Sequence, residues 1–163
     1  MDTLPAIVVA KNDWLHHQIE VDYPTKESLK GRDLYFSRYG NELIYGLDEI
    51  EGQPNINAED IFLVDFHRLT VKFALLQAQK WPSQDDQDLI LEFLSQIIYS
   101  SPCQLYLAFA EGVAVAASIV TCVDNECLIS DVMCIESVHR DDFVQSLAWK
   151  LQAQGLTVTD VEL

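Results

Sequence analysis

The chain has 163 residues, of which 49% are hydrophobic, and its formal net charge is −16. This hydrophobic content excludes a disordered chain, and the length suffices for one domain with a substantial core. A surface this acidic repels phosphate backbones and anionic lipids, so we expect no nucleic-acid partner and no membrane partner. It also disfavours an anionic cofactor, unless the few basic residues are gathered at one site.

The N-terminal stretch and the cysteines bear on the compartment. MDTLPAIVVAKND has no basic leader before its short apolar run, and no run in the chain has the length of a membrane span. We therefore expect a cytoplasmic protein with reduced cysteines. If Asp124-Asn125 is a two-residue hairpin loop, Cys122 and Cys127 face each other within disulfide reach. The four histidines are dispersed and no Cys-x-x-Cys occurs, so no metal site is predicted.

The N-terminal part predicts short elements. Residues 4–10, LPAIVVA, predict a strand, and Asn12 or Asp13 is expected to cap a helix that ends before Pro24.

Two β-type runs, 34–39 and 42–48, flank Gly40-Asn41 and predict a hairpin. Residues 49–60 are rich in acids and turn formers and predict an exposed connection. We therefore expect residues 1–60 to form a strand, helix and hairpin region that packs on a core made by residues 61–163.

Apolar periodicity gives a clearer prediction after residue 61. Helical stripes predict helices over 67–80 and 84–99, and a later stripe at Phe143, Leu147 and Leu151 predicts a helix over 140–154. The turn signals Glu111-Gly112 and Asp124-Asn125 separate three β runs. The expected strands are 104–110, 113–122, 126–134 and a last one at 156–163. The predicted fold class is α+β, a mixed sheet with an antiparallel meander and packed helices, whose last two strands run parallel.

This order of elements resembles the GNAT (GCN5-related N-acetyltransferase) superfamily over residues 67–163. LYLAFAEGVAVAASIV is similar to that family's second and third strands, and ISDVMCIESVHRDDFVQSL is similar to its fourth strand and following helix. The resemblance implies an acyl-CoA N-acyltransferase-like fold, with acetyl-CoA as the cofactor if the chain is an enzyme.

The family's cofactor turn reads Arg or Gln, two residues, Gly, one residue, then Gly or Ala. Here the resemblance places His139 at the first position and Asp142 and Val144 at the two small-residue positions, with Arg140 one place late. A carboxylate beside pyrophosphate at ~4 Å and an effective dielectric near ~20 costs about 4 kcal/mol. The resemblance thus implies a degenerate pyrophosphate turn and no bound cofactor. In the simpler alternative, Asp141 and Asp142 complement the helix dipole.

Three hypotheses follow. The first is a GNAT-fold-like protein that has lost acyl-CoA binding and acts as a binding or regulatory module, as a homodimer or with a protein partner. The second is an N-acetyltransferase of an unknown amine with an atypical acetyl-CoA site. There Arg140 would hold phosphate, and Glu136, Cys134 or His139 would be the general base. The third is an unrelated α+β interaction protein. Whether the chain is an enzyme stays open.

Overall fold

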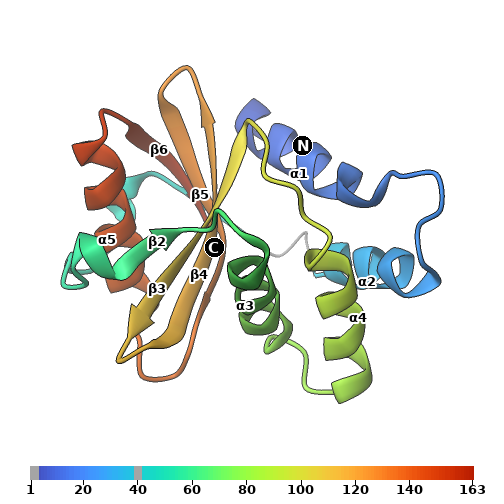
Figure 1. Cartoon of the computed structure of the whole chain (residues 1–163). Helices are drawn as coiled ribbons and strands as arrows, with labels where there is room; N and C mark the ends of the chain where they lie inside the picture. Colours follow the sequence, from blue (N-terminus) through green and yellow to red (C-terminus); the bar gives the residue numbers. More distant parts are fainter. Residues whose placement is uncertain (1–3, 39–41) are drawn as a thin grey trace.

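The computed structural model describes residues 4–38 and 42–163, and its helices pack on both faces of a six-stranded mixed sheet (Figure 1). The strands are β1 (Ile44–Tyr45), β2 (Ile61–Leu63), β3 (Cys103–Ala110), β4 (Val113–Val123), β5 (Glu126–Cys134) and β6 (Thr157–Glu162). The helices are α1 (Ala6–His16), α2 (Lys26–Phe36), α3 (His67–Ala78), α4 (Gln84–Leu94) and α5 (Arg140–Ala153). The chain therefore belongs to the α+β class.

The sheet has the order β1-β6-β5-β4-β3-β2, and its strands are antiparallel except for the β5–β6 pair. Helix α5 connects these two parallel strands, as the sequence predicts. The β4–β5 turn has Asp124 and Asn125 at φ 54° and 66°, a left-handed pair that two-residue hairpins favour. The predicted meander and the parallel last pair are confirmed.

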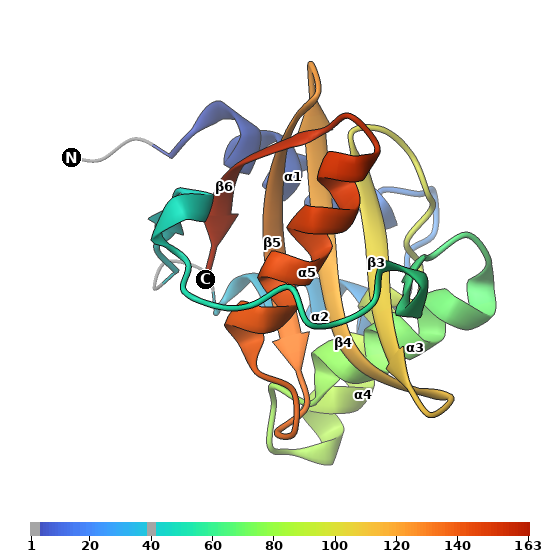
Figure 2. The ribbon, with the colours of Figure 1, turned by 90° about the vertical axis from the view of Figure 1, so that its left-hand side faces the viewer.

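The two faces of the sheet are covered differently. Helices α1 to α4 cover one face, and α5 covers the other (Figures 1 and 2). Each face has its own apolar core: Phe73, Phe93 and Leu105 lie in the first, and Phe143, Leu147 and Ile129 lie in the second.

The predicted strand at 4–10 is wrong, because these residues begin α1. The predicted cap at Asn12 or Asp13 is wrong too, since both residues lie inside this helix. Val8, Lys11 and Leu15 are buried on one side of α1, at helical spacing. Packing against the sheet thus outweighs the preference of β-branched residues for strands.

The predicted hairpin at 34–48 is also wrong. Residues 26–36 form α2, whose N-cap Thr25 accepts a hydrogen bond at 3.0 Å from the backbone N–H of Ser28. Gly31 lets α2 approach α4 closely, because a Cβ at this position would overlap the carbonyl group of Leu89. Gly40-Asn41, the predicted turn, lies outside the described residues.

Residues 46–60 form a segment that we call the strap, which crosses the outer side of α5 (Figure 2). Gln145 donates to the carbonyl of Ile50 at 2.8 Å, and the Ser146 hydroxyl accepts from the N–H of Ile56 at 3.0 Å. Most of residues 49–60 are exposed, as predicted, but this connection is hydrogen-bonded to α5.

The cysteines differ partly from the expectation. Cys122 and Cys127 lie opposite each other with their Cα atoms 4.3 Å apart, as the hairpin register predicts. The structure joins them in a disulfide, whereas we expected thiols throughout; Cys103 and Cys134 are free. Among the described residues, no helix is long and apolar enough to cross a membrane.

Candidate functional site

The predicted cofactor turn lies between β5 and α5. His139 is the N-cap residue of α5, and its side chain makes no capping hydrogen bond. Glu136 and His139 are exposed. Arg140 is exposed as well, and its Nε lies 3.1 Å from Asp141 Oδ1. The first turn of α5 thus carries one cation and two carboxylates at the place where the family resemblance expects pyrophosphate.

The strap covers this helix end. The Asp142 carboxylate accepts hydrogen bonds from the Gln53 backbone N–H at 2.8 Å and from Asn55 Nδ2 at 3.1 Å. Those bonds, the Gln53 bond foremost, hold the pKa of Asp142 below its ordinary value. A Cβ on Gly52 would lie 2.6 Å from the carbonyl carbon of Asp141, so the two backbones are in close contact.

The remaining residues of the predicted site are Val144 and Cys134, and neither is fully exposed. Val144 is 0% exposed and packs in the core of the α5 face. Cys134 ends β5 and is half-buried, and burial raises the pKa of its thiol to about 11. At neutral pH this cysteine is therefore protonated, which makes it a weak nucleophile and a poor general base.

Strands β5 and β6 part halfway along β5. Their pairing runs from Glu126 opposite Thr157 to Ile129 opposite Val161, and the remaining residues of β5 have no partner on β6. At the parting, Asp131 has φ 51° and lies in a bulge, because the register on β4 shifts there. Bulges of this kind reorient side chains and occur next to functional sites.

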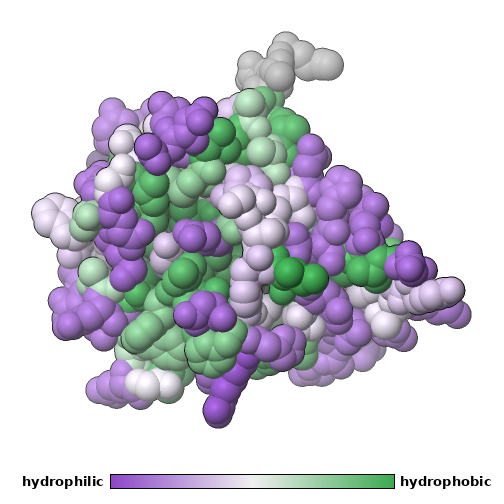
Figure 3. Space-filling model, turned by 45° about the horizontal axis from the view of Figure 1, so that its top comes forward, coloured by the Kyte–Doolittle hydropathy of each residue, from purple (hydrophilic) through white to green (hydrophobic). Residues whose placement is uncertain are grey.

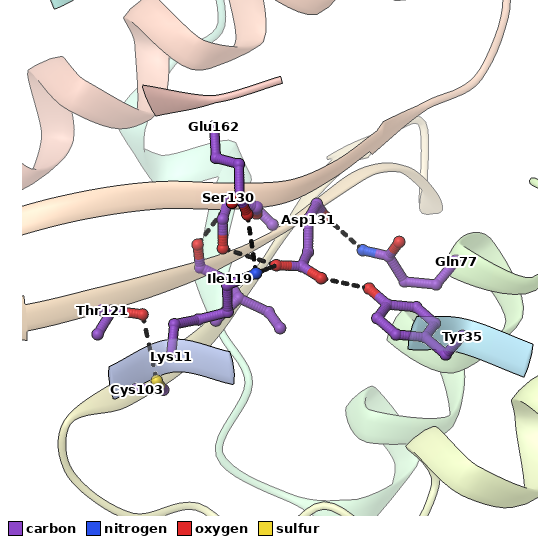
Figure 4. A network of polar contacts seen from close by, with 10 residues as sticks. Lys11, Tyr35, Gln77, Cys103, Ile119, Thr121, Ser130, Asp131 and Glu162 are labelled. Carbon is purple, nitrogen blue, oxygen red and sulfur yellow. Dashed lines mark hydrogen bonds and ion pairs between the residues drawn. The ribbon is translucent and has the colours of Figure 1, made fainter. Parts of the chain in front are cut away.

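A network of buried charges occupies the parting (Figure 4). Lys11 is 0% exposed, and its Nζ lies 2.9 Å from Asp131 Oδ1 and 2.8 Å from Glu162 Oε1. Tyr35 donates its hydroxyl to Asp131 Oδ2 at 2.5 Å, and Ser130 donates to Asp131 Oδ1 at 2.7 Å. Helices α1 and α2 and strands β5 and β6 thus meet in one network, in which Lys11 links Asp131 to Glu162.

The network shifts the pKa of its members. Burial alone lowers the pKa of Lys11, but the carboxylates of Asp131 and Glu162 outweigh it, so the net pKa is raised. Burial raises the pKa of Glu162 against the opposing effect of Lys11. At neutral pH Lys11 is therefore an ammonium that two acids share.

Above the network lies a cavity of about 180 Å³, which we call the charged cavity. It is lined by Tyr35, Arg38, Glu42, Lys80, Trp81, Asp131, Val132, Arg140, Glu162 and Leu163. Arg38 donates to the carbonyl of Lys80 at 3.3 Å, and its guanidinium lies 5.1 Å from the centre of the Trp81 ring. Burial, together with the charges of Arg38 and Lys11, lowers the pKa of Lys80. The composition allows an anionic ligand only where basic residues are gathered at one site. Three of them, Arg38, Lys80 and Arg140, line this cavity.

A second cavity, of about 420 Å³, has mainly apolar walls that include Trp14, Leu63, Ile97 and Leu105. Cys103 lines it as well, and burial raises the pKa of that thiol to about 12, so it carries no thiolate at neutral pH. Hydrophobic side chains also gather on the face shown in Figure 3, where hydrophilic side chains surround them. These regions offer few charged groups to a polar ligand.

The sequence matches no known protein-family model and no curated protein. Within residues 4–38 and 42–163, no group of three or more His, Cys, Asp or Glu side chains is arranged to hold a metal ion.

Of the predicted site residues, only Arg140 lines the charged cavity, whereas Lys11, Tyr35, Lys80, Asp131 and Glu162 were missed. A sequence signal existed for Asp131, which is a lone acid inside the apolar run LISDVMC. Polar groups in such a run are costly to bury unless they are paired.

Proposed function

We propose that this chain is a binding module with an acyltransferase-like fold that does not bind acyl-CoA. The observation that carries the proposal is the strap on the first turn of α5. Pyrophosphate binds at a helix N-terminus through free backbone N–H groups that a ligand can approach closely. Here Gly52 lies against the backbone of Asp141, and the Asp142 carboxylate faces the same space.

Both effects oppose the cofactor. The strap fills the approach to the helix end, and its bonds to Asp142 must break before another group can enter. The carboxylate would then repel a doubly charged pyrophosphate at a cost of about 4 kcal/mol per contact. Micromolar binding corresponds to about −8 kcal/mol, so one such contact and the loss of the strap leave only weak affinity.

One observation favours the second candidate, an N-acetyltransferase with an atypical site. Strands β5 and β6 part beyond Ile129 and Val161, and the charged cavity lies at the parting with Arg140 on its wall. A cofactor entering there would need to displace the strap or to avoid the α5 N-terminus. The two candidates therefore differ in one measurable quantity, the affinity for acetyl-CoA.

Calorimetric titration with acetyl-CoA tests the proposal. We expect no saturable heat up to about 1 mM ligand. Asp142→Asn removes the charge but leaves the strap in place, with Asp141→Asn as the control of equal charge. We expect neither variant to gain binding, because the strap still covers the helix end. A micromolar midpoint with the unaltered protein would reject the proposal in favour of the transferase. Binding gained by Asp142→Asn alone would mean that charge, not the strap, excludes the cofactor.

A further inference from the structure

We propose that the charged cavity is a binding site for a small anion that carries carboxylate or phosphate oxygens. This inference names the ligand class of the proposed binding module and rests on that proposal. Its test uses small anions in place of acetyl-CoA, so the two can fail separately.

The first argument is the distribution of charge. The chain has 10 basic residues against 26 acidic ones. Three of the basic residues, Arg38, Lys80 and Arg140, line this one cavity, and Lys11 lies beneath it. They come from separate stretches of the chain, and the fold brings them together. In a protein of net charge −16, such a cluster of cations is where an anion is least repelled.

The second argument is the unused hydrogen-bonding capacity of the cations. Among the described residues, no carboxylate lies within ion-pair distance of Lys80 or Arg38. Arg38 gives one bond to a carbonyl group, and no hydrogen bond of the Lys80 ammonium is found within residues 4–38 and 42–163. An arginine has five N–H donors and a lysine three, so most of these donors have no acceptor among the described protein groups and are open to water or a ligand.

The buried carboxylates of the cavity, in contrast, already have hydrogen-bond donors. Asp131 already accepts from Lys11, Tyr35 and Ser130, and Glu162 accepts from Lys11. Their charges make the floor of the cavity unfavourable for an anion, and Glu42 adds a carboxylate to the wall. A ligand is therefore expected on the side of Arg38, Lys80 and Arg140. Within the described residues, the acceptors found for these three cations are the carbonyl of Lys80 and the carboxylate of Asp141.

The size and the walls of the charged cavity restrict the class of ligand further. A cavity of about 180 Å³ is smaller than the sites of drug-sized molecules, which start at roughly 300 Å³. The Trp81 ring, 5% exposed, forms a rigid wall beside Arg38. Burial lowers the pKa of Lys80, so a bound anion would restore favourable surroundings to its ammonium form. These features fit a compact anion such as phosphate or a short dicarboxylate.

Titration with inorganic phosphate and, separately, with succinate tests the inference by the amide and side-chain N–H shifts in NMR spectra. Sodium chloride keeps the ionic strength constant, because a chain this acidic responds to salt itself. We expect one of the two probes to saturate in the millimolar range, about 1 to 10 mM, with shifts at Arg38, Lys80, Arg140 and the Trp81 indole. The probe that saturates identifies a phosphate or a carboxylate ligand.

Lys80→Met removes the least compensated cation, and Lys72→Met on α3 is the matched control, with the same change of charge and no part in the cavity wall. We expect Lys80→Met to weaken binding about tenfold or more, and Lys72→Met to leave it within about twofold. Arg140→Gln, at a side chain that is 56% exposed, gives a second variant with little risk to folding.

Two results would overturn the inference. One is the absence of saturation with either probe up to about 20 mM in the folded protein. The other is equal binding by the unaltered chain, Lys80→Met and Arg140→Gln, which would place the anion elsewhere.

Discussion

Each face of this sheet buries an apolar core, but the polar groups beside the two cores differ. On the α5 face, the core is apolar, and the strap forms hydrogen bonds with Gln145 and Ser146 of the helix. On the α1–α4 face, an ammonium and two carboxylates are buried next to a cavity. The strap therefore covers part of one face, and the other face keeps polar groups at the charged cavity. Under our proposal, ligand binding belongs to the second face.

The parting of β5 and β6 explains why the polar groups gather where they do. Up to Ile129 and Val161, the two strands are paired, with one register shift after Cys127. Beyond this point, Asp131 turns in its bulge and needs side-chain partners from the helices. Buried polar groups are stable only with such partners. The same local change thus creates both the buried network and the space above it.

The largest expected effect is the loss of stability when the buried charge network is broken. Lys11→Met leaves Asp131 and Glu162 buried without their shared cation, and breaking a buried pair costs about 3 to 5 kcal/mol of unfolding free energy. Urea denaturation measures this loss. Lys26→Met, at an exposed position on α2, is the control and should change stability by less than about 0.5 kcal/mol. A loss below about 1 kcal/mol for Lys11→Met would show that the ammonium is not needed to balance the acids.

A somewhat smaller effect is expected on the apolar face. Leu147 is 0% exposed, and Leu147→Ala should cost about 2 to 4 kcal/mol through the cavity that it leaves. Leu75→Ala, at a side chain that is 48% exposed on α3, serves as the control. Phosphate or succinate titration of the folded Leu147→Ala protein should give the same shifts as the unaltered chain. Lost anion binding in this variant would contradict the separation of the two faces.

The smallest expected effect is a pH dependence of stability that differs between the two faces. The pKa of Asp142 is lowered in the folded chain, so its bonds to the strap stabilise the fold above its ordinary value of 3.8. This contribution is lost as the pH falls through the folded pKa. The stability difference between the unaltered chain and Asp142→Asn should therefore shrink in acid. The pKa of Lys11 is raised, so its contribution is complete below 10.5 and is lost only at higher pH. A difference that stays constant in acid would show that the strap bonds do not depend on the carboxylate charge.

The C-terminal part of the fold could be predicted because its signals are local. Asp124-Asn125 sets the register of β4 and β5, and Phe143, Leu147 and Leu151 mark the inner side of α5. Helix α2 could not be predicted in this way. Tyr35 and Phe36 favour strands when considered alone, but α2 is held by the contact of Gly31 with α4, almost sixty positions later.

The charged network could not be predicted from the sequence, for a related reason. Lys11, Tyr35, Asp131 and Glu162 are scattered over the whole chain, and Tyr35 lies in a segment that was wrongly predicted as a strand. Arg140 was found because it lies within the resemblance to a cofactor turn. The exposure of residues 49–60 was predicted, but nothing in their sequence reveals that α5 supplies their hydrogen-bond partners.

The bond between Lys11 and Glu162 also bears on the order in which elements pack during synthesis. The two residues are 151 positions apart, so α1 leaves the ribosome long before its partner is made. At about 5 to 20 residues per second, this interval is about 8 to 30 seconds. During that time the Lys11 ammonium stays in water, because burial without its acids is too costly. We expect α1 to dock only when β6 is complete, so that the nascent chain exposes its apolar face until the last strand is in place.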